Sequence, residues 1–398
     1  MTIFGIADIN YRSVDSGVNK FSGLAQDGIA SSRLGVRGEE EIAKGLKAGF
    51  WFEGALNPDT GTPGGLNFMR RSTVSLMGAV GELRIGRDYT PAFTLIGLVD
   101  PFGTVGVGSY LNIGGSQVIS DPLPFAISPQ EQQDTSGTFY TADRGTARRT
   151  DASGLRAAAL TDARVTFADP NAVRANNTIA YHSPSFSGFS GAIMAGFGNE
   201  NTYQFRGSNQ NMMGLKLQYD VGPIKAGYAF QETKGGVTAS AASGVATGPV
   251  TTGLLNGIAL NATNGSGDQK WTTNVAIASY DLKVVRLGYM YKTDSLKIPG
   301  AGDDLKTKTN TFSAVVPMGA ITGKIAYTQK RGEFDGESGK IATLLGLGLQ
   351  YDLSKRTALY GNYAQLNNEE GSANTVGSSP ANSGVTSKGF EVGIRHSF

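Results

Sequence analysis

Cysteine is absent from the 398 residues, and histidine occurs only twice. The first absence excludes disulfides, thiolate catalysis and cysteine-ligated metal sites. The second leaves little scope for zinc sites or Ser-His-Asp chemistry. No apolar run reaches the roughly 18 residues of a transmembrane helix. Neither sign of charge is in clear excess, since 35 basic and 33 acidic residues give a net charge of +2. No overall field therefore favours nucleic acid.

Catalytic constellations are equally sparse. His182 is expected at a turn and His396 on an apolar face near the terminus, and neither has a serine and a carboxylate placed beside it. The acidic pairs Glu39-Glu40 and Asp303-Asp304 are predicted to lie in solvated turns or loops. The second pair could offer oxygen ligands to calcium, although nothing requires such a site. We expect neither an enzyme nor a cofactor or metal.

Glycine, by contrast, is abundant, with 56 residues, about twice the usual share. The mean hydropathy of -0.17 fits a soluble β protein and also a membrane barrel with a wet lumen. A transmembrane strand needs only about 10 residues, with an apolar outer face. The chain begins at Met1 without a leader segment, so an exported protein would be numbered here in its mature form.

Apolar and polar residues alternate along most of the chain. In the first segment, Ile3, Ala7 and Ile9 share one face, and Asp8 and Asn10 share the other. A two-residue period predicts strands, and sixteen such segments can be counted, joined by seven tight turns and eight longer connections in alternation. This arrangement is typical of outer-membrane barrels with short periplasmic turns and longer outside loops. The sequence therefore predicts an all-β fold, a single sixteen-stranded antiparallel barrel over residues 1–398.

One stretch, Asp88 to Val173, breaks the alternation for roughly 85 residues. Long connections without structure of their own are uncommon in compact domains and are usually functional or disordered. It is the third long connection in the count. Its second half, Thr141 to Asp169, is strongly basic and includes Arg144 and Arg148.

The final segment is the most specific local signal. Phe390, Val392 and Ile394 alternate with polar residues, and the chain stops on Phe398. Together with the segments FGIADIN, SRLGVRGEEEIAKGLKAGFWFE, RRSTVSLMGAVGELRIGRDYTPA, DPFGTVGVGS, RANNTIAYHSPSFSGFSG and LSKRTALYGNYA, the closing GIRHSF resembles the trimeric sixteen-stranded general porins of Gram-negative outer membranes, closest to their β-proteobacterial branch.

The resemblance implies a water-filled diffusion channel that the third long loop, residues 88–173, folds into and narrows. It also implies constriction residues, with arginines on the wall and an acid on the loop: Arg33, Arg71, Arg87, Arg174 and Asp100. Strict alternation also places Arg33, Arg71 and Arg174 on the lumen face, because each lies on the face opposite its apolar neighbours. It places Arg70 and Arg87 on the outer face, so Arg87 rests on the resemblance alone unless a bulge turns it inward.

Four further arginines are candidates for lining the pore: Arg12, Arg37, Arg144 and Arg148. The last two belong to the basic part of the long loop, which either lines the vestibule or forms a surface flap. Phe398 matches the family's terminal signal for outer-membrane assembly.

The expected function is passive diffusion of small hydrophilic solutes across the outer membrane, with a preference for anions, because rings of arginine favour anions in pores. A channel selective for phosphate or organic acid anions is the alternative, and a surface-adhesion role for the loops is a third. The resemblance implies a homotrimer, contacts with outer-membrane lipid and lipopolysaccharide, and recognition by the outer-membrane assembly machinery. The outer face of the first strand, Ile3, Gly5, Ala7 and Ile9, and the loop Asn57 to Leu66 are the expected trimer contacts.

Overall fold

The computed structural model describes residues 1–17, 19–61, 67–114, 117–120, 132–133, 139–140, 142–143, 146–147, 165–169, 171–198, 211–235, 238–241, 254–255, 258–259, 270–297, 304–334, 337–369, 372, 374–377 and 384–398. Its main sheet is antiparallel and contains the following strands: β1 (Thr2–Asp15), β2 (Lys20–Gln26), β3 (Arg33–Ala43), β4 (Leu46–Ala55), β5 (Arg71–Gly78), β6 (Gly81–Tyr89), β13 (Arg174–His182), β14 (Phe189–Gly196), β15 (Asn211–Val221), β16 (Ile224–Lys234), β20 (Lys270–Asp281), β21 (Arg286–Lys297), β22 (Leu305–Met318), β23 (Ile321–Phe334), β24 (Glu337–Asp352), β25 (Thr357–Asn368) and β26 (Ser387–Ser397).

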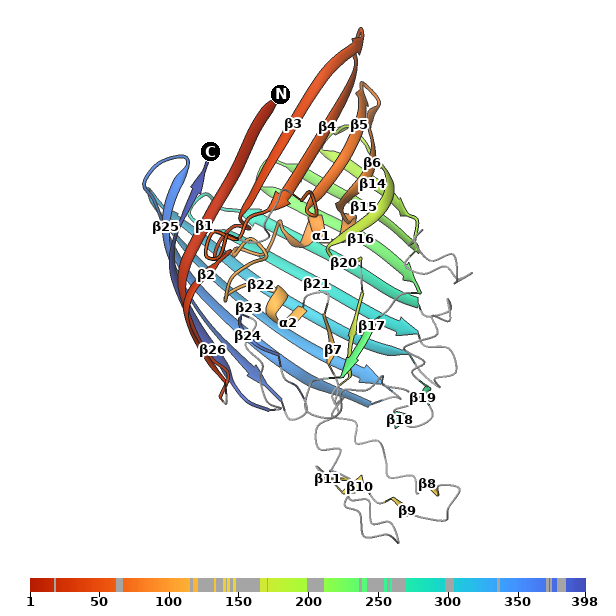
Figure 1. Cartoon of the computed structure of the whole chain (residues 1–398), viewed down its shortest axis with the longest axis vertical. Helices are drawn as coiled ribbons and strands as arrows, with labels where there is room; N and C mark the ends of the chain where they lie inside the picture. Colours follow the sequence, from red (N-terminus) through yellow and green to blue (C-terminus); the bar gives the residue numbers. More distant parts are fainter. Residues whose placement is uncertain are drawn as a thin grey trace.

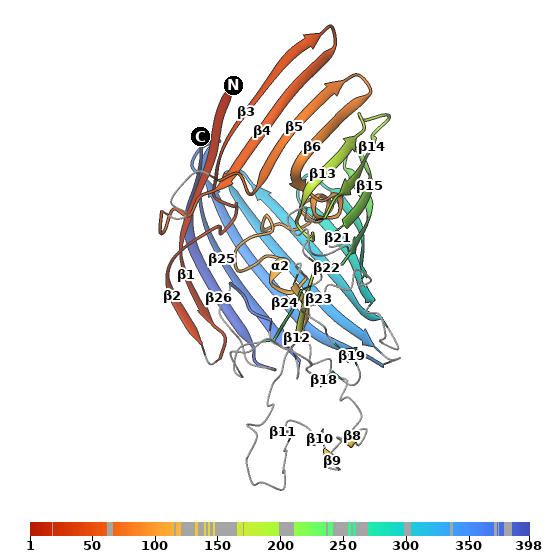
Figure 2. The same ribbon diagram turned by 45° about the vertical axis from the view of Figure 1, so that its right-hand side comes forward.

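The sheet closes on itself, because β1 pairs with β26 on one side and with β2 and β3 on the other. β2 and β3 lie end to end along β1, so together they complete one wall strand, and the barrel is sixteen-stranded as predicted. The stretch GVNKFSGLAQDG, residues 17–28, predicts a loop by sequence alone, but Lys20–Gln26 within it is strand. Figures 1 and 2 show the ring of tilted strands with both termini at the end that carries the short turns.

Alternation separates an outer from an inner face. On β5, for example, Val74 is 58% exposed whereas Thr73 is 1% exposed. Many large apolar residues of the other wall strands are exposed in the same outward row, and most inward residues are small or polar. Large apolar residues such as Val275, Met290 and Leu344 point inward where the long connection covers the wall. A sheet with an apolar outside and a polar inside suits a barrel that crosses a membrane around a wet lumen.

Two polar stretches, residues 294–308 and 332–340, predict loops by sequence alone but are largely strand. β21 continues to Lys297 and β22 begins at Leu305, within the expected loop 294–308. β23 and β24 likewise run through most of the expected loop 332–340. These strand ends are polar on both faces, as the lysines and threonines of β22 show, so they extend the barrel without the apolar alternation that reveals a strand in a sequence.

The chain turns into the lumen between β2 and β3. Asp8, fully buried on β1, accepts hydrogen bonds from the backbone N–H of Gly28, Ile29 and Ala30 at 3.2, 2.9 and 2.9 Å. The hydroxyl of Tyr360 donates to the same carboxylate. Four donors on one carboxylate satisfy its buried oxygens, and they hold this excursion against the inner wall.

Short elements occupy the connections. The helices are α1 (Pro91–Ile96) and α2 (Leu111–Gly114), and the strands are β7 (Gln117–Ser120), β8 (Gln132–Gln133), β9 (Phe139–Tyr140), β10 (Ala142–Asp143), β11 (Thr146–Ala147), β12 (Val165–Ala168), β17 (Thr238–Ala241), β18 (Leu254–Leu255) and β19 (Ile258–Ala259). Both helices lie within the ring of strands (Figure 1). Within the described ranges, no helix is long and apolar enough to cross a membrane.

Candidate functional site

Arginines gather on the inner face of β3 to β6 and at the start of β13. The register pairs Glu53 with Arg71 and Trp51 with Arg37 across neighbouring strands, so these four side chains share one face. With Arg33, Arg70, Arg84 and Arg174 they form a group that we call the arginine cluster. Its six arginines are accompanied by three carboxylates: Glu53, Glu82 and Asp88.

Glu53 is the first carboxylate of the cluster. Its Oε1 lies 2.7 Å from Nε of Arg70 and 3.6 Å from Nη1 of Arg33. Trp51 Nε1 donates to its other oxygen at 3.3 Å. Glu53 is therefore held by two guanidinium groups and an indole, and it is 4% exposed.

Asp88 is the second carboxylate that contacts two arginines. Arg84 Nη1 lies 2.6 Å from Oδ2 of Asp88, and Arg84 Nη2 lies 2.7 Å from Oε2 of Glu82. Arg71 approaches Asp88 from the other side at 3.7 Å and donates to Thr73 Oγ1 at 3.1 Å. Bidentate and charge-assisted contacts of this kind fix a guanidinium in one orientation, so the inner wall presents its positive groups in a rigid array.

Aromatic rings support the same arginines. The guanidinium carbons of Arg71 and Arg37 lie 4.5 and 4.8 Å from the ring centroid of Trp51. Arg174 lies 4.2 Å from the centroid of Tyr89 and donates to its hydroxyl at 2.6 Å, as Arg70 does at 2.7 Å. Guanidinium groups stack readily on aromatic faces, and stacking leaves their N–H edges free to meet a ligand.

The described part of the long connection lies against the rest of the inner wall. Ala92, Leu95 and Ile96 of α1 and the following Val99 form a buried apolar cluster with residues of β16, β20 and β21: Ala229, Val275, Ile277 and Met290. Lys216 of β15 donates to Thr94 Oγ1 at 3.0 Å. The loop therefore covers the wall that the arginine cluster leaves free.

Further along, the loop continues across β22 and β24. Ser313 donates to the carbonyl of Val99 at 2.8 Å. Phe102 is fully buried over Gly346 and Gly348, where a Cβ atom would lie 2.9 Å from its ring. Glycine at these two positions is what allows the ring to reach the wall.

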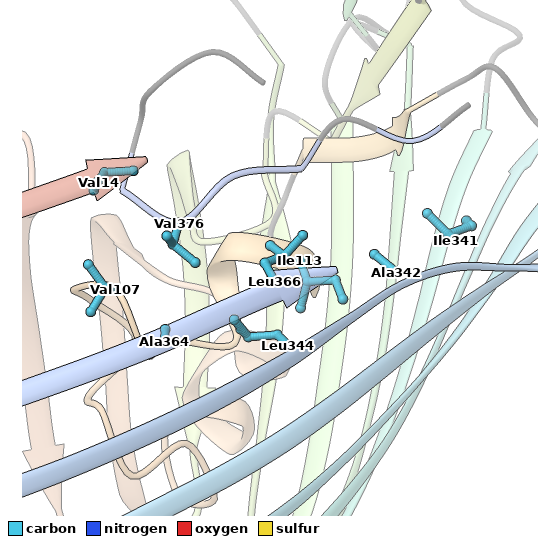
Figure 3. Packing of buried hydrophobic residues seen from close by; sticks show 9 residues of the cluster. All are labelled: Val14, Val107, Ile113, Ile341, Ala342, Leu344, Ala364, Leu366 and Val376. Carbon is cyan, nitrogen blue, oxygen red and sulfur yellow. The ribbon is translucent and has the colours of Figure 1, made fainter. Parts of the chain in front are cut away.

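A second apolar cluster fixes the loop at the far side of the barrel. It joins Val107 and Ile113 of the loop to side chains of β1, β24 and β25 and of a later connection: Val14, Ile341, Ala342, Leu344, Ala364, Leu366 and Val376. Figure 3 shows these nine residues, from distant parts of the sequence, converging beside α2. Residues 90–114 thus contact the wall from β15 round to β26.

Arg12 takes part in this attachment and not in the cluster. Its Nε donates to Glu391 at 2.9 Å, and its Nη2 donates to the carbonyl of Gln26 at 2.8 Å. Glu391 also accepts from Asn362 at 2.9 Å and from the backbone N–H of Val107 at 3.3 Å. The expectation that Arg12 lines the pore is therefore wrong, because its charge is used to anchor the loop.

Asp100 also differs from expectation. Its carboxylate accepts from the backbone N–H of Phe102 at 2.9 Å and of Tyr110 at 3.1 Å, and from Ser109 Oγ at 3.1 Å. It is 7% exposed, and burial raises the pKa of its carboxyl. The side chain turns back into its own loop and does not face the arginines, because three donors in that loop compete successfully for it.

The loop returns to the wall through Asp169. It accepts from the backbone N–H of Asn171 at 2.9 Å and from Gln231 Nε2 at 3.1 Å. Burial raises the pKa of this carboxyl to about 6. The chain between β12 and β13 is thereby tied to the inner face of β16.

Arg87 lies on β6, two residues before Tyr89. It is paired with Ser72 on the row of exposed Ile85, and it donates to the carbonyl of Met69 at 2.5 Å and to Asn176. A bulge does occur here, but on β13, where two residues oppose Arg87. The side chain of Arg87 is thus held by Met69 and Asn176, and its place in the constriction stays a prediction. Arg144 and Arg148 lie outside the described residues.

Sequence reasoning missed Arg70, Arg84 and Glu53, among other members of the cluster. Arg84 and Glu53 could have been found by alternation, since both lie opposite apolar neighbours on their strands. Arg70 was assigned outward by parity, but it precedes β5 and its backbone N–H donates to the carbonyl of Glu53 at 3.0 Å. Parity fails for a residue that is not yet part of the strand.

Comparison with known proteins supplies the context for this geometry. The sequence profile of the Gram-negative porins matches residues 1–371. The chain is 31% identical over 412 residues to outer membrane porin protein 32 of Delftia acidovorans, covering 100% of this chain and 94% of that protein. It is 26% identical over 455 residues to an outer membrane porin protein of Bordetella pertussis, covering 100% of this chain and 94% of that protein.

Solved structures agree. An anion-selective porin from Comamonas acidovorans superposes with a TM-score of 0.73 at 29% identity, covering 100% of this chain and 99% of that one. OmpT of Vibrio cholerae, in the form lacking its loop L8, superposes with a TM-score of 0.62 at 12% identity, covering 100% and 98%. The second likeness concerns the fold alone.

Proposed function

The chain belongs to the Gram-negative porin family, and we propose that its pore passes small anions in preference to cations through the arginine cluster. As a porin it is an integral β-barrel of the outer membrane and a channel for passive diffusion. Selectivity is the proposed part. The observation that carries it is the excess of arginine over carboxylate on one wall of a lumen whose other wall is covered by residues 90–114.

The physical reason lies in the setting of these charges. A narrow pore strips an ion of part of its hydration, and fixed charges act there through a lower effective dielectric than in bulk water. Guanidinium groups stay charged at any working pH and present planar forks that fit carboxylate, phosphate or sulfate oxygens. Since three carboxylates answer only half of the six arginines, an anion meets a net attraction. The anion-selective relative from Comamonas acidovorans supports the same direction.

Reversal potentials in planar bilayers under a salt gradient test the proposal. Arg33→Ala, Arg71→Ala and Arg174→Ala should each lower the anion-to-cation permeability ratio about twofold to tenfold, because each removes one lumen charge. Arg356→Ala is the matched control, since Arg356 is exposed in a short turn. Unchanged selectivity in all three lumen variants would overturn the role of the cluster.

The same recordings separate a general pore from a substrate-selective one. In a general pore, the anion current rises in proportion to the anion concentration. A channel built for phosphate or organic acids shows saturation and block of chloride current by its substrate. The guanidinium forks are compatible with both kinds of channel. Block of the chloride current at low substrate concentration would therefore favour the substrate-selective channel over the general pore.

Assembly is proposed on two features. The outer face of β1, with exposed Ile3 beside the small residue Ala7, suits close contact with another copy, and we place a homotrimer interface there. The expected latch, Asn57 to Leu66, lies partly outside the described residues. Phe398 is proposed as the signal read by the assembly machinery. Monomers after crosslinking in detergent would contradict the trimer.

A further inference from the structure

The lumen side of residues 90–114 presents no charged group. Asp100 is the only charged residue in this range. Its carboxylate is buried and accepts hydrogen bonds from Phe102, Ser109 and Tyr110 of the same loop. The arginine cluster therefore shares the lumen with a neutral surface of the loop. Residues 90–114 can act on a passing anion only through uncharged groups.

The first helix of the loop turns an aromatic ring toward the lumen. α1 buries four residues against the inner wall: Pro91, Ala92, Leu95 and Ile96. Phe93 lies outside this buried face and is only partly buried. Because α1 lies within the ring of strands (Figure 1), a side chain that projects away from the wall looks into the lumen.

Further apolar side chains continue this surface along the loop. Leu98, Pro101 and Val105 are each only partly buried, and Leu98 packs at the edge of the apolar cluster beneath α1. Covering apolar surface that is in contact with water is favourable. The lumen thus has guanidinium groups on one side and, on the loop, a surface that gains from contact with an apolar group.

Tyr89 joins this apolar surface to the arginine cluster. Its ring is parallel to that of Phe93, with an interplanar angle of 6° and centroids 5.4 Å apart. The guanidinium carbon of Arg174 lies 4.2 Å from the centroid of Tyr89. One tyrosine therefore holds a fixed positive charge and the ring of Phe93 next to each other.

Arg174 keeps hydrogen-bond donors for a ligand. Its Nη2 donates to the hydroxyl of Tyr89 at 2.6 Å, whereas its Nε is buried and has no acceptor among the described residues. A buried donor without a partner is costly. A carboxylate would supply the acceptor, and its two oxygens match the planar fork of a guanidinium group. The acidic end of a ligand thus has a place beside Tyr89.

We propose that the pore favours carboxylates with an aromatic body and that Phe93 determines this preference. The inference rests on the proposed anion selectivity and adds a substrate class to it. The carboxylate contacts Arg174, and the ring of the same molecule packs against the lumen side of Phe93, where offset stacking is favourable. A compact anion such as acetate makes the first contact and not the second.

Block of the chloride current by benzoate and by acetate in planar bilayers tests the proposal on the full-length folded barrel. The two anions have the same charge and the same head group and differ in the ring. Benzoate should reach half-block at a concentration about threefold to tenfold below that of acetate, the range that one aromatic contact contributes. Equal half-block concentrations would overturn the proposal. Block by benzyl alcohol at the benzoate concentration would overturn it too, because that molecule has the ring without the charge.

Variants of Phe93 test the assignment to this residue. Phe93→Ala should bring the half-block concentrations of benzoate and acetate together, and Phe93→Tyr should keep them apart. Phe312→Ala is the matched control and should behave as wild type does. Phe312 also pairs with a tyrosine, Tyr289, at a centroid distance of 4.9 Å, yet it is 55% exposed on the outer face. An unchanged benzoate preference in Phe93→Ala would overturn the role of Phe93.

Reversal potentials in sodium chloride keep this test separate from that of anion selectivity. A wild-type pore that prefers chloride over sodium but does not prefer benzoate over acetate would refute the aromatic preference alone. A wild-type pore without chloride preference would refute the role of the arginine cluster. Single-channel conductance in chloride reports a folded barrel for each variant.

Discussion

Glu53 lies between two arginines of the lumen wall and is the group whose removal changes the charge of the wall most directly. It touches Arg33 and Arg70 and faces Arg71 across the sheet. Its role is both structural and electrostatic, because it orders the guanidinium groups while cancelling part of their field. These two effects have opposite consequences and can be separated by experiment.

Glu53→Gln should raise the anion-to-cation permeability ratio, a change opposite in sign to that of the arginine variants. It should also lower the free energy of unfolding by about 1–3 kcal/mol, because the charge-assisted hydrogen bond from Arg70 and the ion pair with Arg33 are both weakened. Reversal potentials and urea unfolding measure the two effects. Glu39→Gln is the control, since its side chain is 59% exposed at the short-turn end. A fall in anion preference in Glu53→Gln would contradict the assignment.

At the scale of elements, the loop after β6 is shaped by the wall that it touches. Gly346 and Gly348 open a site for Phe102, and Glu391 accepts the backbone N–H of Val107. The inner wall is thus complementary in shape to this loop, and the small residues of β24 are explained by the space that the Phe102 ring needs. The loop in turn explains why Asp100 is unavailable to the lumen, since its donors are needed to form the turn that places Phe102.

Gly346→Ala should displace this loop toward the lumen. The added Cβ would lie 2.9 Å from both the Phe102 ring and the carbonyl oxygen of Gly108. Overpacking of this kind costs about 1–3 kcal/mol, and the displaced loop should lower single-channel conductance. Gly361→Ala on β25 is the control, because a Cβ there meets nothing closer than 3.9 Å. Wild-type conductance and stability in Gly346→Ala would show that the loop is not held there.

For the whole molecule, closure of the barrel is the event that removes free sheet edges, which otherwise invite aggregation. The last contacts are made by Phe398, whose backbone exchanges two hydrogen bonds with Gly5, at 3.0 and 3.1 Å. Its ring lies over Gly5, where a Cβ would be 2.4 Å away. The terminal residue is therefore part of the wall as well as the proposed assembly signal.

Phe398→Ala distinguishes these two roles. It keeps both backbone hydrogen bonds, so refolding into detergent, followed by heat-modifiable gel mobility, should remain close to wild type. The yield of folded protein in the outer membrane of cells should fall severalfold if the ring is the recognised feature. Phe390→Ala, another exposed aromatic on β26, is the control. An equal loss in both settings would make the ring a structural element only.

The sequence by itself determined the barrel, because an apolar outer row and a polar inner row repeat with a period of two and the connections alternate in length. Alternation on their strands also predicted a shared lumen face for Arg33, Arg71 and Arg174. Polar strand ends such as Leu305–Lys308 carry no such pattern, and they became visible only as pairs in the sheet.

Tertiary structure decided the partners of each charge. Arg12 and Asp100 have the residue types and positions expected of pore groups, yet Glu391 and the N–H groups of the loop bind them more closely than the lumen does. Arg70 and Glu53 entered the site through a contact between β4 and the residue before β5. Ion pairs and buried hydrogen bonds depend on distances of a few ångströms between segments remote in sequence, and a periodic pattern holds no information about them.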